Sequence, residues 1–136
     1  MITSIILYSM IGVSLEVIFN AIRFSLKYSP YGYALKGEVS IWMFPIYGFG
    51  LTYGFDLIYC IMNYVSDDDI VRWLSYPLWI WLVEIIIGLP TKRNLWNYSD
   101  IRYNWKGVVS LKHYPAWVAF GILIEHLRVY TDQLLL

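Results

Sequence analysis

Four long stretches of this chain carry almost no charge, and they limit its possible folds more than any other feature. We place them at about residues 2–24, 40–65, 70–89 and 114–135. Each comes close to or exceeds the roughly 20 residues that a helix needs to cross a bilayer. Membrane β-strands would be shorter and alternating, and a spanning segment must close its own backbone hydrogen bonds, so the runs predict helices. The fourth run is the weakest, because charged residues gather in its second half.

The composition agrees with this interpretation. Hydrophobic residues make up 59% of the chain and charged residues 15%, which is far from an average soluble protein. We therefore predict an all-α membrane protein: a four-transmembrane-helix bundle forming one integral membrane domain over residues 1–136, with an aromatic interfacial or re-entrant loop before the last helix. A formal net charge of zero gives no electrostatic footprint for nucleic acid. The single cysteine, Cys60, excludes an intramolecular disulfide.

The positions of Lys and Arg predict the orientation. They cluster after the first and third runs, so the positive-inside rule places those two loops in the cytoplasm and both termini on the other side. The first run lacks a basic leader and contains Glu16, which favours a retained helix over a signal peptide. We expect Asp67, Asp68 and Asp69 to form an outer turn and helix cap. The expected location is a multi-pass position in a membrane, with a bacterial plasma membrane as the first expectation.

Three glutamates interrupt the apolar runs: Glu16, Glu84 and Glu125. A carboxylate near the bilayer centre costs about 2.5–3.5 kcal/mol, so such residues usually face protein or a wet cavity and mark a working site. Glu16 is followed at helical spacing by Asn20 and Arg23, which puts an acid, an amide and a base on one stripe. Arg128 and Asp132 follow Glu125 in the same way. Glu84 is alone on its helix, with Arg23, Arg93 and Arg102 as available cations.

These acids also have a purely structural interpretation. Interhelical polar contacts stabilise membrane bundles by roughly 0.6 kcal/mol each on average, so the glutamates could simply hold helices together. For one glutamate alone the two interpretations weigh equally. The three together favour a shared polar site. Glycines in the second run, Gly48, Gly50 and Gly54, are predicted to be notches for helix packing, the last two at G-x-x-x-G spacing.

Aromatic residues make up 19% of the chain and many stand at the ends of the runs, where membrane anchors belong. Examples are Tyr28, Tyr31 and Tyr33 after the first run, and Trp73 and Tyr76 at the start of the third. The segment 95–111 is unusually aromatic for a connecting loop and is interspersed with polar residues. We predict that it folds back and covers the polar site, since irregular backbone is tolerated at membrane depth when it is buried in protein.

Several motifs occur in a distinctive order. They are Glu16, Trp42, Pro45-Ile46-Tyr47-Gly48, Glu84 with Gly88, Trp96-Asn97-Tyr98-Ser99, Asn104, Gly107 and Trp117. This order, over about residues 5–127, resembles the CmpB-type ABC-transporter type IV family of small multi-span membrane proteins, including its vertebrate four-span relatives. The family's usual Trp-Asp-Tyr-Ser has Asn97 in place of the acid here. The resemblance implies an architecture and a site that comprises Glu16, Tyr47, Gly48, Glu84, Trp96, Tyr98, Ser99, Asn104 and Gly107.

The functional hypothesis is a permease-like transport component for a small polar solute or cation. The chain has no G-x-x-x-x-G-K-[ST] motif, so an ATP-driven role would need a separate subunit. Four spans provide little protein around a transport pathway, so we expect a homo-oligomer or a partner subunit to complete it. Membrane lipid is the other expected partner. The alternatives are a membrane-embedded enzyme that handles lipid headgroups and a non-catalytic assembly or scaffold protein. The predicted substrate- or ion-binding residues are Glu16, Asn20, Arg23, Tyr47, Glu84, Trp96, Tyr98, Ser99, Arg102, Asn104 and Glu125.

No catalytic residue is assigned, and whether the chain is an enzyme stays open, with non-enzymatic roles favoured. His113 and His126 lack the spacing of a helical zinc site, and no nucleophile elbow occurs. The sequence therefore predicts no metal and no cofactor.

Overall fold

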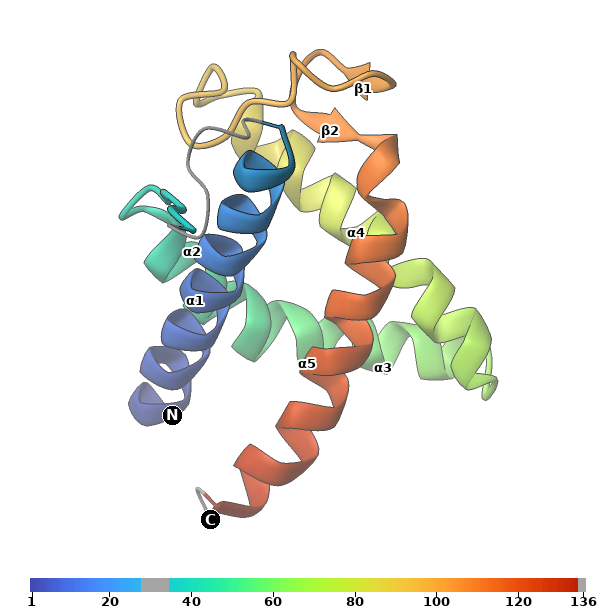
Figure 1. Ribbon diagram of the computed structural model, residues 1–136. Helices are drawn as coiled ribbons and strands as arrows, with labels where there is room; N and C mark the ends of the chain where they lie inside the picture. The colour runs from blue at the N-terminus through green and yellow to red at the C-terminus, as the bar shows by residue number, and fades with distance from the viewer. Residues whose placement is uncertain (28–34, 135–136) are drawn as a thin grey trace. The chain divides into compact units, whose positions relative to one another are not determined.

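The computed structural model describes residues 1–27 and 35–134, and it is mostly helical (Figure 1). Its main-chain contacts divide it into two compact units, Met1–Phe55 and Asp56–Leu136. The all-helical class is therefore confirmed in outline. The three tyrosines predicted as anchors after the first run, Tyr28, Tyr31 and Tyr33, lie outside the described residues.

The first unit is built on α1 (Ile2–Lys27) and α2 (Met43–Phe49), which pack side by side. Gly48 makes this approach possible, because a Cβ atom there would run into the Ser9 hydroxyl and the Ile5 side chain of α1. Ser9 is fully buried. The predicted packing role of Gly48 is thus confirmed.

A π-helical turn, η2 (Gly50–Gly54), follows α2 directly. The Phe55 N–H donates to the Gly50 carbonyl, five residues back, as in a π-helix. A Cβ atom at Gly50 or Gly54 would meet nothing within 4 Å among the described residues. The packing notch predicted at these two glycines is therefore wrong within this structure. The prediction assumed a regular α-helix, and the wider turn breaks the i, i+4 register on which it depended.

The second unit contains α3 (Phe55–Val65), α4 (Asp69–Gly88) and α5 (Tyr114–Leu134). Asp68 caps α4, since its side chain accepts a hydrogen bond of 2.8 Å from the Ile70 N–H, which confirms the predicted cap. Helices α4 and α5 pack together, and a Cβ at Gly121 would strike the Tyr76 ring. This small residue lets a large ring lie between the two helices.

The segment between α4 and α5 is ordered and largely non-helical. It holds two short antiparallel strands, β1 (Asn104–Trp105) and β2 (Val109–Ser110), and one 3-10 turn, η3 (Leu111–His113). The strands pair Asn104 with Ser110 and Trp105 with Val109. The sequence did not predict this hairpin.

Two helices within the described residues are long and apolar enough to cross a membrane. Their candidate spans are Ile2–Arg23 in α1 and Asp69–Gly88 in α4. The second predicted run is instead divided among α2, η2 and α3. The fourth run corresponds to α5, whose charged second half lowers its apolar character.

Candidate functional site

A tyrosine hydroxyl donates a hydrogen bond to each of the three glutamates of the apolar runs. Tyr47 of α2 bonds to Glu16 of α1. In the second unit, the Tyr98 hydroxyl donates to Glu84 over 2.8 Å, and Tyr76 donates to Glu125. Hydrogen bonds to a carboxylate are among the stronger ones in proteins, and here each joins two different segments. The Tyr–Glu pair is therefore the recurring polar unit of this molecule.

Glu16 sits half-buried on α1, and its surroundings in the first unit explain how Tyr47 reaches it. A Cβ at Gly12 would collide with the Tyr47 ring, so the ring lies across α1 one turn before Glu16. The second carboxylate oxygen of Glu16, Oε2, is buried and has no hydrogen-bond partner among the described residues. A buried carboxylate oxygen in this state has capacity for a proton, a cation or a polar solute.

The other two polar residues of the predicted stripe, Asn20 and Arg23, lie about one and two turns beyond Glu16 on α1. The Asn20 amide donates over 2.9 Å to the backbone carbonyl of Glu38, which ties the segment before α2 to α1. Arg23 is half-exposed near the end of the helix. This bond gives Asn20 a structural contact, while its predicted role as a ligand residue stays a prediction.

Glu84 lies on α4 and is 7% exposed, while its partner Tyr98 is 8% exposed. The loop that carries Tyr98 can sit on the helix end because Gly88 lies one turn beyond Glu84. A Cβ at Gly88 would come 2.6 Å from the Val108 side chain. The Trp96 indole N–H fixes the loop further by donating to the Val108 carbonyl over 3.0 Å. The prediction that this aromatic segment folds back over a polar residue is confirmed at Glu84.

Two more aromatic rings extend the Glu84 environment. The Tyr98 ring meets the His113 ring edge to face at 5.0 Å, and His113 meets Trp117 in the same way at 6.0 Å. His113 is buried. Sequence reasoning considered His113 only as a metal ligand and missed this contact, although its place just before the last apolar run puts it beside the loop.

Two of the cations predicted as partners of Glu84, Arg93 and Arg102, make other contacts within the loop. The Arg102 guanidinium is exposed and lies 4.8 Å from the centre of the Tyr103 ring. The Arg93 guanidinium lies 3.4 Å from the Ser99 hydroxyl. Arg102 therefore makes its described contact at the protein surface, and its role as a site residue stays a prediction.

The polar residues of the loop mainly hold the loop together. Asn97 Oδ1 accepts from the Ser99 N–H over 2.9 Å and from the Ser99 hydroxyl over 2.6 Å. Asn104 donates to the Ile101 carbonyl and accepts from the Gly107 N–H. Gly107 has a φ of +69°, a left-handed conformation that favours glycine. Trp96, Ser99 and Asn104, predicted as binding residues, thus shape the support for Tyr98.

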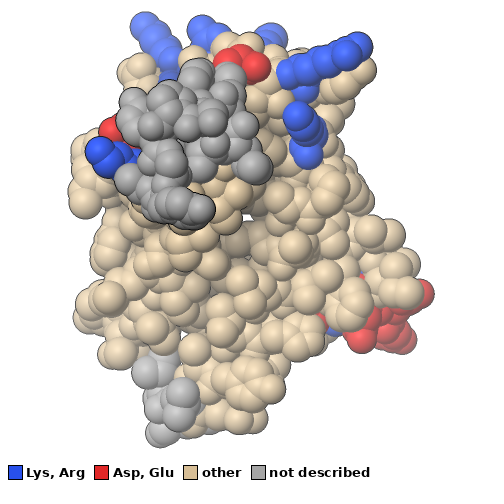
Figure 2. Space-filling view, viewed as in Figure 1, with Lys and Arg blue, Asp and Glu red and all other residues tan. Residues whose placement is uncertain are grey.

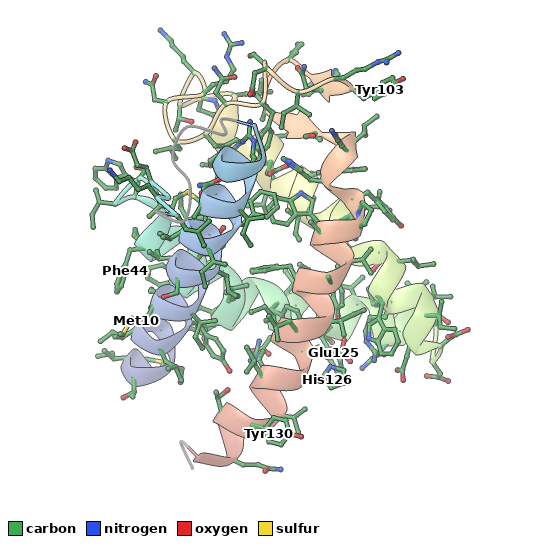
Figure 3. All side chains as sticks on the ribbon, viewed as in Figure 1. Met10, Phe44, Tyr103, Glu125, His126 and Tyr130 are labelled. Carbon is green, nitrogen blue, oxygen red and sulfur yellow. The ribbon has the colours of Figure 1, made fainter. Side chains whose placement is uncertain are left out.

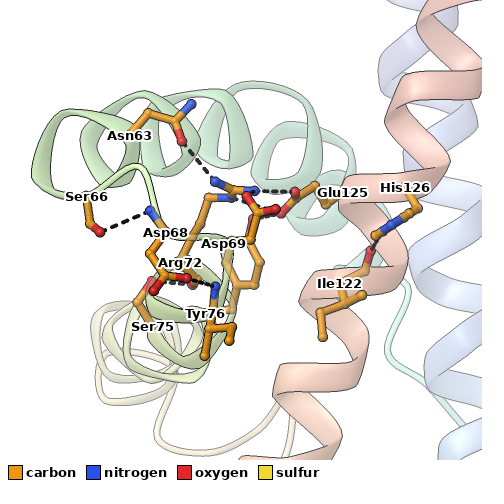
Figure 4. A network of polar contacts seen from close by, with 11 residues as sticks. Asn63, Ser66, Asp68, Asp69, Arg72, Ser75, Tyr76, Ile122, Glu125 and His126 are labelled. Carbon is orange, nitrogen blue, oxygen red and sulfur yellow. Dashed lines mark hydrogen bonds and ion pairs between the residues drawn. The ribbon is translucent and has the colours of Figure 1, made fainter.

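Glu125 belongs to a different network, centred on Arg72 of α4 (Figure 4). The Arg72 guanidinium donates two hydrogen bonds to the Glu125 carboxylate, of 3.2 Å from Nε and 2.7 Å from Nη2. It also contacts Asp69 at 2.5 Å and the Asn63 amide oxygen at 3.1 Å. The Arg72 side chain is only 6% exposed, so this is a buried, bidentate ion pair.

This network corrects one prediction and gives contacts for two arginines. Tyr76, predicted as a membrane anchor, is 2% exposed and bonds to Glu125. Arg128, predicted to share a stripe with Glu125, pairs with Asp56 at 2.5 Å. Arg72 was not among the predicted site residues. The missed signal was its place in the first turn of α4, where a long side chain can reach back over neighbouring helices.

The two acids of the second unit do not share one site. Tyr76, the partner of Glu125, lies eight residues before Glu84 on α4, which is about 12 Å along a helix axis. Glu16 belongs to the first unit, so its convergence with Glu84 stays a prediction.

No protein-family model matches this chain, and no solved structure matches it. The resemblance to the CmpB-type family therefore remains an expectation from the sequence motifs.

Proposed function

We propose that this chain is a multi-pass membrane protein and a permease-like transport component for a small polar solute or cation, with Glu16 and Glu84 as its binding carboxylates. The proposal includes four spans, formed by α1, the α2–η2–α3 region, α4 and α5. It also includes membership of the CmpB-type family and a homo-oligomer or partner subunit that completes the pathway.

The exposed faces of the two candidate spans support the membrane location. Only 17% of the α1 window and 22% of the α4 window are buried within the protein, whereas the core helix of a soluble protein would be mostly buried. Large apolar side chains repeat every four residues on these exposed faces: Ile2, Ile6 and Met10, then Ile18 and Ile22, on α1, and Ile70, Leu74, Leu78, Leu82 and Ile86 on α4. Exposed apolar stripes of this length are typical of helix faces that contact lipid.

The observation that carries the transport role is the buried Oε2 of Glu16, which has no hydrogen-bond partner among the described residues. Its other interaction is a tyrosine hydroxyl, which can both donate and accept a hydrogen bond. A carboxyl group held this way can exchange a proton or a small cation at Oε2 while it keeps its contact with Tyr47. The Glu84–Tyr98 pair repeats the chemistry under the loop.

Glu125 favours the second candidate, a non-catalytic assembly role. Its carboxylate is held by Arg72 and Tyr76, so it locks α5 against α4 and leaves little capacity for a ligand. The lipid-handling enzyme has less support, because the exposed Arg102 side chain does not meet an acid in the described contacts.

Ion flux in proteoliposomes tests the proposal. Vesicles with the purified full chain and a trapped pH dye receive an outward potassium gradient, and proton and potassium movement is followed with selective ionophores. We expect flux above that of protein-free vesicles, and a loss of at least ten-fold for Glu16→Gln and for Glu84→Gln. Asp67→Asn, an exposed acid outside the pairs, is the matched control and should keep wild-type flux.

Two results would reject the transport role. One is wild-type protein that conducts no better than protein-free vesicles. The other is a Glu16→Gln, Glu84→Gln double variant that folds and conducts like wild type. Normal flux together with loss of oligomer integrity in the glutamate variants would support the assembly role instead.

A further inference from the structure

We propose that the outer face of the loop between α4 and α5 binds the headgroups of anionic phospholipids in the surrounding bilayer. This basic loop face consists of exposed cations and aromatic or apolar side chains: Lys92, Arg93, Arg102, Tyr103, Trp105, Lys106, Leu111 and Lys112. The inference rests on the membrane location proposed above but not on the transport role of Glu16 or Glu84.

Charge is the first argument. The loop from residue 89 to residue 113 has five Lys and Arg residues and a single acid, Asp100. Figure 2 shows Lys and Arg side chains standing out over this loop, while acidic side chains gather near the turn between α3 and α4. Each cation near an anionic membrane surface contributes about 1 kcal/mol of attraction. The loop face is therefore complementary to an anionic surface.

Aromatic rings interleave with these cations. Tyr103 is 63% exposed and Trp105 is 45% exposed, although both are large side chains in an ordered hairpin. Figure 3 shows Tyr103 pointing outward at the hairpin. The Arg102 guanidinium lies 4.8 Å from the Tyr103 ring centre, and the Lys106 ammonium lies 4.9 Å from the Trp105 ring centre. Tyrosine and tryptophan favour the headgroup level of a bilayer, where a ring and a cation can both be satisfied.

The backbone gives an independent argument. Lys92, Arg93, Tyr103 and Lys106 have φ values between 52° and 64°, in the left-handed region. This conformation costs a non-glycine residue roughly 1–2 kcal/mol, and glycine would adopt it without that cost. Such backbone conformations persist where the surrounding structure enforces them, and they cluster at binding sites. Here all four residues belong to the basic loop face. Lys, Arg and Tyr side chains are therefore present at positions where the backbone conformation favours glycine.

The position of the loop selects lipid as the occupant. The loop begins at the end of α4, at Gly88, and leads into α5 at Tyr114. If both helices cross the bilayer, the loop stands at the membrane surface and its exposed face meets headgroups. The Trp96–Val108 bond and the β1–β2 pairing hold that face as one platform.

Equilibrium binding to the purified full chain in uncharged detergent tests the inference. The probes are fluorescent short-chain phosphatidylglycerol and phosphatidylcholine. We expect phosphatidylglycerol to bind at least ten-fold more tightly, with the difference shrinking in high salt. Lys106→Gln should weaken phosphatidylglycerol binding about five-fold and leave phosphatidylcholine binding unchanged, as expected for one surface charge. Trp105→Ser should weaken binding of both lipids.

The controls separate this site from other effects. Asp67→Asn changes the net charge by one unit at the turn before α4 and should not alter lipid preference. Tyr64→Ser removes a 93% exposed ring at the end of α3 and should also be neutral. Glu84→Gln should retain lipid binding even if it abolishes flux, so the two proposals can fail separately. Equal binding of both lipids, wild-type binding by folded Lys106→Gln, or tighter binding of an acidic peptide or RNA would overturn the inference.

Discussion

The Tyr98 hydroxyl donates a hydrogen bond of 2.8 Å to the Glu84 carboxylate, and this bond joins the loop after α4 to the interior of α4 itself. Both side chains are less than a tenth exposed. A buried carboxylate of α4 thus holds the loop that covers it. The same chemistry recurs with Tyr47 and Glu16 in the first unit.

Tyr98→Phe should destabilise the protein by about 1.5–3 kcal/mol, because a buried carboxylate loses its hydroxyl donor while the ring volume is kept. Thermal unfolding in detergent, followed by circular dichroism, measures the effect. Tyr103→Phe removes an exposed hydroxyl and is the matched control, with little change expected. Equal stability of the two variants would show that the Tyr98 bond contributes nothing.

Arg72→Met should cost about 3–5 kcal/mol of unfolding free energy, since it leaves Glu125 without its cation. Glu125→Met should cost a similar amount, and the double variant should cost clearly less than the sum. Asp69→Asn alters an acid of the same network whose side chain is 62% exposed, so we expect a change below about 1 kcal/mol. A double-mutant cycle by chemical denaturation gives the coupling energy. Strict additivity would contradict a buried pair.

Gly48→Ala and Gly54→Ala should change stability in opposite directions. The new methyl group at position 48 has no room against Ser9, so overpacking should cost about 1–3 kcal/mol. The methyl group at position 54 meets open space, and alanine should gain up to about 1 kcal/mol of helix propensity. Thermal unfolding compares the two variants. A change of oligomeric state in Gly54→Ala, measured by light scattering, would instead reveal a packing role for the G-x-x-x-G motif between copies.

Gly107→Ala should destabilise the loop, because a side chain is strained at φ +69° and would strike the Ser99 hydroxyl. The expected cost is at least about 1–2 kcal/mol. Lys106→Gly is the neighbouring control, since glycine relieves the left-handed strain at φ 52° and should not lower stability. Hydrogen exchange of the Tyr98 and Val108 amides reports on the loop directly. Unchanged protection in Gly107→Ala would contradict the role given to this glycine.

The sequence predicted the apolar helices well where their ends carry local signals. The third run was placed at 70–89 and α4 spans Asp69–Gly88, because an aspartate cap starts it and a Gly-Leu-Pro sequence follows its end. The first run was placed at 2–24 and α1 spans Ile2–Lys27. The π-helical turn at Gly50–Gly54 was not predicted. Hydropathy does not indicate whether a backbone N–H bonds to the carbonyl four residues back or to the one five residues back.

The site residues were predicted as types but not as pairs. Glu16, Tyr47, Glu84 and Tyr98 were all named, whereas Tyr76 was assigned to the membrane surface and Arg72 was not named. Arg72 and Glu125 are separated by 53 residues, so their meeting depends on how α4 packs against α5. The sequence shows which charged residues are costly to bury, but it does not show which residue pairs with each of them.

The sequence by itself determined where this chain is apolar, where α1 begins, where α4 begins and ends, and which acids must find a polar environment. These properties are additive along the chain, because transfer free energy and capping act within a few residues. The tertiary structure alone decided that tyrosines serve the three acids, that Arg72 holds Glu125, and that the cations of the loop face outward. Those choices depend on close packing between distant segments, where one glycine or one extra residue in a turn redirects a side chain.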